Sequence, residues 1–208
     1  LKANNINFIN IFANDIFSLN PDIIHVLPKR TKFLPYPYKK VFPKRSISYP
    51  YSKLSILHAP SNRDNKGTNF IINIVNRINN NDLGFKINLV ILENKSNKYI
   101  LENIDKFDLI IDQLLIGWYG SISIESMALG IPVICYLREE DLVFIPQEMR
   151  NEITVINANQ FTLENKIIEY MQLNKKQVYD LSQKSISYIQ KWHSIESTSI
   201  IFKELFKK

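Results

Sequence analysis

Residues 107–137, FDLIIDQLLIGWYGSISIESMALGIPVICYL, contain the pattern that decides the fold. Two apolar runs, 108–115 and 132–137, enclose a stretch of small and polar residues that ends at Gly130. Runs this uniformly apolar predict strands that are buried on both faces, as in parallel sheets. The residues between them, 121–129, predict a helix, because a glycine such as Gly130 is typical of a helix C-terminus.

The same alternation of strand and helix extends to both sides of this stretch. Further predicted strands are 54–60, 85–92 and 154–157, and further predicted helices are 67–80 and 96–106. A helical tail is predicted at 162–173, at 174–192 with a capping box of Asn174 and Gln177, and at 195–206. We therefore expect an α/β domain with a Rossmann-like, doubly wound parallel sheet and a helical C-terminal tail.

The composition is that of a globular protein, with 45% hydrophobic and 22% charged residues. A chain of 208 residues buries enough surface to fold without disulfides or metals. The single cysteine, Cys135, is expected to be a buried structural thiol in a reducing compartment. We see no signal peptide and no apolar run near the ~20 residues that a membrane span needs. We therefore expect a cytoplasmic protein.

A basic, proline-rich connector precedes the alternating part. Six of the nine prolines lie between Pro28 and Pro60, so we expect extended chain rather than a helix or a central strand. The connector is either a solvated linker or an attractor of anionic lipid or phosphate-bearing ligands. Nucleic acid fits less well, because no RNP-like or helix-turn-helix pattern is present. Residues 23–63 contain no acidic residue and nine basic ones: Lys29, Arg30, Lys32, Lys39, Lys40, Lys44, Arg45, Lys53 and Arg63.

Ahead of the connector, the sequence predicts too little structure for a separate domain. Residues 4–13 predict a helix and residues 15–19 a short strand. Residues 21–27 place a proline where the first turn of a helix tolerates it.

Two polar loops follow predicted strands at the edge where parallel sheets bind ligands. The first, HAPSNRDNKGT, offers four polar side chains ahead of a helix N-terminus at Gly67-Thr68: Ser61, Asn62, Arg63 and Lys66. Helix amides, an arginine fork and a lysine suit phosphate oxygens, although a solvent-exposed capped loop is the alternative. We expect His58, at the start of this loop, to be a structural histidine.

The second loop is the turn within the opening stretch. Gly117 and Gly120 allow close approach of the backbone, and the amides of Gly120, Ser121 and Ile122 open the next helix. Glu125 on that helix is expected to accept two vicinal ribose hydroxyls, or else to be a surface glutamate favoured near a helix N-terminus. Together the two loops predict a diphosphate site.

The sequence lacks the motifs of several other binding and catalytic sites. The sequence has no G-x-x-x-x-G-K-[ST], no G-x-G-x-x-G and no G-x-S-x-G. No D-x-D or cluster of His and Cys indicates a metal site, so we expect no cofactor.

The segment ILHAPSNRDNKGT and the opening stretch resemble the C-terminal, donor-binding half of GT-B glycosyltransferases, in the retaining family 4-like group (glycosyltransferase group 1). The resemblance covers residues 54–137 best and the two ends more loosely. It implies that residues 1–45 end an acceptor domain and form the interdomain linker, and that residues 46–208 bind a nucleotide sugar. The implied activity is hexosyl transfer from a UDP or GDP sugar to a bacterial surface polysaccharide or glycolipid, in the cytoplasm or at the inner face of the membrane.

The resemblance also implies roles for residues. Lys66, with Arg63 nearby, would neutralise the donor diphosphate, and Gly120 and Ser121 would approach the sugar and phosphates. Glu125 matches the second Glu of the E-x7-E motif, which holds the ribose. Such enzymes need no metal, because basic groups and helix amides stabilise the leaving nucleoside diphosphate.

The chain departs from that pattern at three places. The first Glu of E-x7-E falls at Gly117, and Asp112 or Gln113 are candidates to replace its sugar contact. The usual Arg falls at Pro60, which leaves Arg63 as a displaced substitute. Most of an acceptor domain is absent, so we expect no transfer by this chain alone. The alternatives are a nucleotide-sugar-binding module without transfer and a GT-B-fold nucleotide-sugar epimerase.

Overall fold

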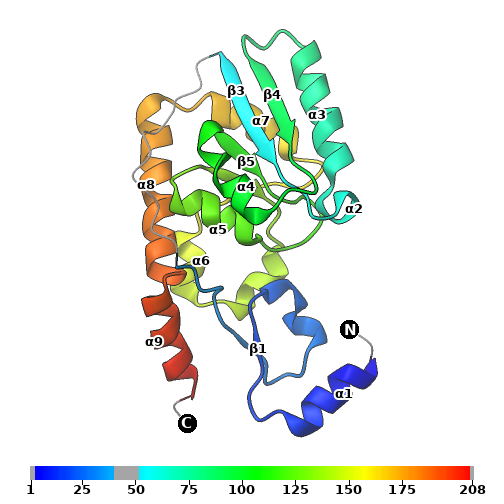
Figure 1. Ribbon diagram of the computed structural model, residues 1–208, viewed down its shortest axis with the longest axis vertical. Helices are drawn as coiled ribbons and strands as arrows, with labels where there is room; N and C mark the ends of the chain where they lie inside the picture. Colours follow the sequence, from blue (N-terminus) through cyan, green and yellow to red (C-terminus); the bar gives the residue numbers. More distant parts are fainter. Residues whose placement is uncertain (1–2, 40–51, 207–208) are drawn as a thin grey trace.

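The computed structural model describes residues 3–39 and 52–206. Its centre is a five-stranded sheet, parallel throughout, in the order β4-β3-β5-β6-β7, with helices on both faces (Figure 1). The strands are β3 (Lys53–His58), β4 (Lys86–Ile91), β5 (Leu109–Ile111), β6 (Val133–Cys135) and β7 (Ile156–Asn157). The predicted doubly wound parallel sheet is confirmed, including its fifth strand.

The two faces of the sheet have separate apolar cores. Leu54, Ile56 and Ile111 face α3 (Thr68–Asn80) and α7 (Leu163–Met171). Leu57, Ile110, Val133 and Cys135 belong to the core on the other face, with residues of α5 (Ser121–Ala128) and α8 (Lys175–Trp192). Alternate residues of each strand thus point to opposite faces, and both faces are buried, which explains the uniformly apolar runs.

The order of the strands creates a topological switch point between β3 and β5. The chain passes from β3 outward to β4 and then returns past β3 to β5, so the connections on the two sides of this point diverge. In open α/β sheets ligands bind at such a switch point, beyond the carboxyl ends of the strands. The loop that follows β3 and the loop that follows β5 both lie there, and they are the two polar loops of the sequence.

Shorter elements complete the chain. They are α1 (Ala3–Phe12), β1 (Phe17–Ser18), η1 (Pro21–Val26), β2 (Lys32–Phe33), α2 (Arg63–Lys66), α4 (Asn97–Leu101), η2 (Ile104–Lys106), η3 (Glu139–Phe144), α6 (Gln147–Glu152) and α9 (Ile195–Phe206), where η is a 3-10 helix. The sequence did not predict β2, α2, η3 or α6, because elements this short have no measurable periodicity. The segment 21–27 was expected to start an α-helix and forms a 3-10 helix instead.

The N-terminal segment lies beyond the carboxyl ends of the main strands, next to α9 (Figure 1). Its strands β1 and β2 form a parallel two-stranded sheet. The part of the connector that the structure describes contains β2 and then extended chain, with a single bridge between Tyr38 and Ser194. Residues 40–51, including Lys40, Lys44, Arg45 and the predicted domain boundary between 45 and 46, lie outside the described residues.

The beginning of α8 confirms the predicted capping box. The Asn174 side chain accepts a hydrogen bond from the Gln177 amide at 3.0 Å, and the Gln177 side chain accepts one from the Asn174 amide at 2.8 Å. The face of α8 that packs on the rest of the domain includes Val178, Ser185, Tyr188 and Trp192, which are buried, and Leu181, which is half-buried.

Candidate functional site

At the switch point between β3 and β5, three residues contact Asp112, which directly follows β5: Lys66, Gly120 and Ser123. One carboxylate oxygen of Asp112 pairs with Nζ of Lys66. The other accepts hydrogen bonds from the Gly120 amide at 2.7 Å and from the Ser123 hydroxyl at 2.6 Å. These four residues, the Asp112 cluster, therefore join the loop after β3 to the first turn of α5.

Both members of the ion pair are shielded from water. The Asp112 side chain is 0% exposed and the Lys66 side chain 12% exposed. A buried carboxylate is stable only when it is paired and hydrogen-bonded, and Asp112 has three donors. The predicted phosphate-binding Lys66 is thus held in place, with its charge balanced by Asp112.

The loop after β3 differs from its prediction in one respect. The helix N-terminus predicted at Gly67-Thr68 is confirmed, because α3 begins at Thr68 with Gly67 as its capping residue. A short helix that the sequence did not predict, α2, comes before it and is capped by Asn62. The Asn62 side chain accepts from the Asn65 amide at 2.9 Å, while Ser61 is exposed. The Gly67 amide donates to the Asp64 carbonyl at 3.2 Å, so it points back into α2.

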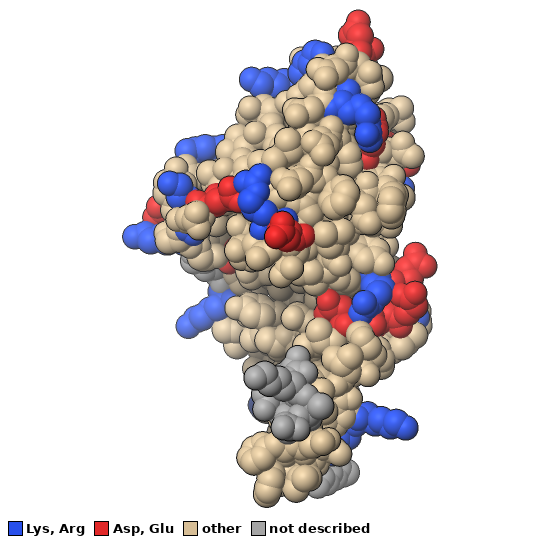
Figure 2. Space-filling view, turned by 90° about the vertical axis from the view of Figure 1, so that its right-hand side faces the viewer, with Lys and Arg blue, Asp and Glu red and all other residues tan. Residues whose placement is uncertain are grey.

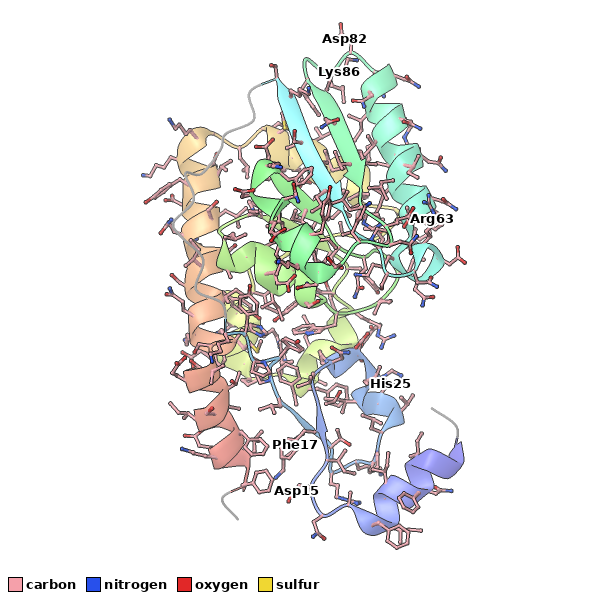
Figure 3. The ribbon with its side chains drawn as sticks, viewed as in Figure 1. Asp15, Phe17, His25, Arg63, Asp82 and Lys86 are labelled. Carbon is pink, nitrogen blue, oxygen red and sulfur yellow. The ribbon has the colours of Figure 1, made fainter. Side chains whose placement is uncertain are left out.

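Arg63 lies at the rim of the loop, on the side of α2 away from the sheet's centre (Figure 3). Its guanidinium pairs with Glu93, just beyond β4, at 2.7 Å. The Arg63 side chain is 43% exposed, and surface pairs of this kind are worth only about 0–1 kcal/mol. The structure brings Lys66, and not Arg63, to the Asp112 cluster.

His58, the last residue of β3, is a structural histidine. Burial lowers the pKa of His58, so its ring is neutral. Its Nδ1 donates to the carbonyl of Ile111 at 2.8 Å, and its Nε2 accepts from the Thr68 hydroxyl at 2.9 Å. The ring therefore fastens β3 to β5 and to the start of α3, with both nitrogens in use.

The N-terminus of α5 faces the cluster. The Gly120 amide is bound by Asp112, and the carbonyl of Gly120 accepts from the Ser123 amide at 3.1 Å. Ser121 is exposed, whereas the Ile122 side chain belongs to the core. The amides of Ser121 and Ile122 are in the first turn, where the helix dipole favours an anion.

Glu125 lies in the second turn of α5 and is nearly buried, at 7% exposure. One of its oxygens accepts from the Asn97 side chain, at the start of α4, at 3.0 Å. Burial, and then the Glu125 carboxylate, raise the pKa of the Tyr38 hydroxyl. Glu125 is therefore not the alternative surface glutamate.

Gly117 does not face open space. A Cβ at this position would lie 2.7 Å from the Cβ of Arg138 and 3.4 Å from the Cβ of Asp22. Arg138 is itself held, because its guanidinium pairs with Asp141 and donates to the Asp22 carbonyl at 2.6 Å. The space next to residue 117, where the family's first glutamate would begin, is filled.

Neither Asp112 nor Gln113 is available to replace that glutamate without rearrangement. Asp112 is engaged as described, and the Gln113 side chain donates to the carbonyl of Trp118. The Trp118 indole stacks on Tyr119, with ring centroids 4.2 Å apart. Gln113 thus holds the turn between Gly117 and Gly120 from within.

Tyr119 ties this turn to the C-terminal helices and to the connector. Its hydroxyl lies 2.8 Å from Nε2 of His193 and 2.8 Å from the Tyr188 hydroxyl. Nδ1 of His193 donates to the Tyr36 carbonyl at 2.8 Å. Burial lowers the pKa of His193 to about 4, so the ring is neutral and its Nε2 accepts from Tyr119.

Two hollows are formed by residues other than those of the cluster. They have volumes of about 420 and 380 Å³ and lie at the carboxyl ends of β6 and β7. Leu137, Glu139 and Asn157 line both. Neither hollow is lined by Lys66, Asp112 or Glu125.

Four general features bear on function. Among residues 3–39 and 52–206, no group of His, Cys, Asp or Glu could hold a metal ion. No helix in that part of the chain is long and apolar enough to cross a membrane. On the face shown in Figure 2, basic and acidic side chains lie beside one another. Cys135 is buried, and burial raises the pKa of its thiol, which confirms the predicted structural role.

Sequence reasoning missed the contacts of Asp112, Ser123 and Asn97. A signal existed for Asp112, because a lone carboxylate directly after a buried parallel strand lies at the ligand-binding edge. No local signal marked Asn97, since its partner Glu125 is distant in the sequence.

Comparisons with known proteins agree on the fold. No family model and no curated protein matches the sequence. A TarM mutant from S. aureus, in complex with fondaparinux, alpha-GlcNAc-glycerol and UDP, has a TM-score of 0.62 at 14% identity, over 100% of this chain and 43% of that one. A glycosyltransferase from Rickettsia africae has a TM-score of 0.65 at 14% identity, over 100% and 68%. Sucrose-phosphate synthase from Thermosynechococcus elongatus has 0.63 at 14%, over 94% and 58%.

These similarities show that the chain has the GT-B glycosyltransferase fold, as the sequence resemblance implied. The chain spans less than half the length of the TarM structures that it matches.

Proposed function

We propose that this chain is the donor-binding half of a glycosyltransferase that transfers a sugar from a nucleoside-diphosphate sugar to a polysaccharide or glycolipid acceptor. One observation carries the proposal. At the switch point of a GT-B fold, the half-buried Lys66 ammonium and the Gly120 amide at the N-terminus of α5 both contact Asp112.

This arrangement suits the diphosphate of a donor. The ammonium of Lys66 and the amides of Ser121 and Ile122 are donors aimed at negative charge, and the dipole of α5 adds to them. When the bond to the sugar breaks, charge develops on the leaving phosphate, and fixed donors in a water-poor site stabilise it. Arg63 is the second cation. Because its pair with Glu93 is exposed and weak, Arg63 exchanges Glu93 for a phosphate oxygen at little cost.

Glu125 is the candidate for the ribose. Its carboxylate is oriented by Asn97 and is shielded from water, so a hydrogen bond to a sugar hydroxyl would be strong.

We further propose that the reaction needs no metal and takes place in the cytoplasm, with the acceptor entering from a second domain. The structure of the TarM mutant contains UDP, so UDP is the first nucleotide to test. Addition of EDTA should leave UDP binding unchanged if no metal takes part.

A peripheral contact with anionic membrane is part of the proposal, and the connector is the segment that would make it. Two of its cations, Arg30 and Lys32, are occupied as helix caps, while Lys29, Lys39 and Lys53 are exposed among the described residues. Sedimentation with phosphatidylglycerol vesicles, compared with phosphatidylcholine vesicles, tests this. Equal sedimentation with both would remove the membrane contact.

A binding module that recognises the nucleotide without transfer is the second candidate. The packing at Gly117 favours it, because the family's first glutamate has no space here. Product analysis with the intact protein separates these readings: a transferred sugar supports the transferase, unchanged donor supports the module, and an epimerised donor supports the nucleotide-sugar epimerase.

The experiment that tests the donor site is a thermal shift with UDP, GDP and ADP. A ligand at about 100 times its dissociation constant stabilises by about 2.7 kcal/mol, or about 5–10 °C for a chain of this size. We expect a shift with one nucleotide, lost in Lys66→Ala and in Glu125→Ala and kept in the exposed control Lys184→Ala. A cooperatively folded protein that shifts with none of the three would overturn the assignment.

A further inference from the structure

We propose that Asp112 is a positioning residue that assembles the phosphate site before any ligand arrives. It holds the Lys66 ammonium and the first turn of α5 in one arrangement. This inference rests on the proposed function, since it names the residue on which the donor's diphosphate contacts depend. It adds a role for a carboxylate that does not itself touch the ligand.

The contacts of Asp112 reach both halves of the site. One oxygen binds Lys66, and the other accepts from the Gly120 amide at 2.7 Å and from the Ser123 hydroxyl at 2.6 Å. A Cβ at residue 120 would lie 3.2 Å from that oxygen and 3.7 Å from Nζ of Lys66. A glycine at this position therefore lets the turn close on the ion pair.

Electrostatics explain why a carboxylate is needed here. The ammonium of Lys66 lies next to Gly120, at the positive end of the α5 dipole, and these like charges repel each other. The charge of Asp112 lies between them and offsets the repulsion. Because Asp112 is buried and has three donors, an incoming phosphate would bind to the outer side of Lys66 and of α5 without displacing it.

Substitution with asparagine distinguishes positioning from a simple charge effect. If Asp112 only opposed the negative ligand, Asp112→Asn would bind nucleoside diphosphate more tightly, since a repulsive charge is removed. If it positions the site, binding weakens. An asparagine side chain has one acceptor oxygen, and its NH2 group would face another hydrogen-bond donor. Lys66, Gly120 and Ser123 therefore cannot all find an acceptor. The sign of the change in affinity decides between the two.

The test is a UDP titration of the wild type, Asp112→Asn and Ser123→Ala. Ser123→Ala keeps the charge of Asp112 and removes one of its three hydrogen-bond donors. This variant tests the proposal if Asp112→Asn fails to fold. The control Asp82→Asn has the same charge change at the opposite end of the sheet, as Figure 3 shows. We expect binding at least about tenfold weaker in Asp112→Asn, about three- to tenfold weaker in Ser123→Ala, and unchanged in the control.

A spectroscopic reading of the Gly120 amide separates positioning from general destabilisation. Gly120 is the only glycine in the chain that follows a tyrosine, so labelling with ¹³C-tyrosine and ¹⁵N-glycine marks its amide alone. An amide bound to a carboxylate resonates downfield. We expect that signal to move upfield in Asp112→Asn and to be unaffected in Asp82→Asn.

The outcomes keep the two proposals apart. If the wild type binds UDP and both cluster variants bind it equally well or more tightly, the positioning role is wrong and the donor site stands. If the wild type binds no nucleotide, the proposed function fails, and the Gly120 signal decides the positioning role. A signal that does not move in Asp112→Asn would overturn that role in either case.

Discussion

Gly117 lacks a side chain at a place where the backbone packs closely against Arg138 and Asp22. Its carbonyl accepts from the Arg138 amide at 3.0 Å, and the Cβ of Arg138 occupies the space that a side chain would need. Arg138 is fixed in turn by Asp141 and by the Asp22 carbonyl. The absence of the glutamate is therefore coupled to the docking of the N-terminal segment and is not an isolated substitution.

Restoring a side chain at residue 117 should destabilise the protein. We expect Gly117→Ala to lower the free energy of unfolding by about 1–3 kcal/mol, because its Cβ would overlap that of Arg138. Gly117→Glu should do so at least as much. Urea unfolding measures both, with the exposed Asp82→Ala as control. Unchanged stability in Gly117→Ala would show that the Arg138 backbone moves freely.

His193 should make the protein less stable in acid. Its folded pKa is about 4, below its usual value of 6.5. Between these pH values the unfolded chain takes up a proton that the folded protein does not, so the free energy of unfolding falls as the pH falls through this window. The loss from His193 alone reaches about 3 kcal/mol at most.

The variant His193→Gln isolates that contribution, because other groups titrate in the same way in both proteins. We expect the stability difference between wild type and variant to shrink as the pH is lowered from about 6.5 to 4. Two parallel curves of unfolding free energy against pH would contradict a buried, neutral His193.

At the level of single elements, the basic connector turns out to be partly a capping device. The Arg30 guanidinium donates to the carbonyls of Asn10 and Ala13, at the end of α1, at 2.7 and 2.6 Å. The Lys32 ammonium donates to the carbonyl of Leu205, at the end of α9, at 2.7 Å. Cations at helix C-termini satisfy free carbonyls and complement the helix dipole.

Removal of the Arg30 cap should loosen α1 and little else. In Arg30→Met, we expect amide hydrogen exchange in α1 to become about fivefold faster, equivalent to about 1 kcal/mol of local stability. Exchange in the main sheet should be unchanged. The neighbouring Lys29→Met is the matched control, since Lys29 is exposed. Equal exchange rates in both variants would mean that Arg30 does not hold the helix.

In the molecule as a whole, the N-terminal segment shares a core with the α/β domain. Ile24 and Phe33 belong to the same buried cluster as Trp118, and the rings of Phe33 and Trp118 meet edge to face at 5.9 Å. The Tyr38 amide donates to the carbonyl of His193 at 2.6 Å. The segment is therefore a part of the folded domain rather than a loose extension.

We expect a single unfolding transition as a consequence. Fluorescence of the two tryptophans and far-ultraviolet circular dichroism should have the same midpoint. Phe33→Ala should lower the free energy of unfolding by about 3 kcal/mol, because it opens a cavity against Trp118. Both midpoints should fall together. Tyr36→Ala, at an exposed side chain, is the control. A separate early transition in fluorescence would show that the segment detaches on its own.

The sequence by itself determined the alternation of strands and helices, the parallel sheet and the capping box at Asn174. These features depend on residues within a few positions of one another, so periodicity and caps reveal them. The same reasoning located the two loops of the candidate site, because the carboxyl ends of parallel strands share one edge. The strand β5 was expected to run to residue 115, but it ends at Ile111. The next residue, Asp112, binds the Gly120 amide through its side chain.

Only the tertiary structure decided which polar groups meet. Lys66 pairs with Asp112, Arg63 with Glu93, and Glu125 with Asn97, and the sequence separations of these pairs range from 28 to 46 residues. A long charged side chain can reach many partners, and its local sequence does not say which of them the packing of helices on the sheet will bring near. The same holds for Gly117, whose neighbours Asp22 and Arg138 approach it only after the N-terminal segment has docked.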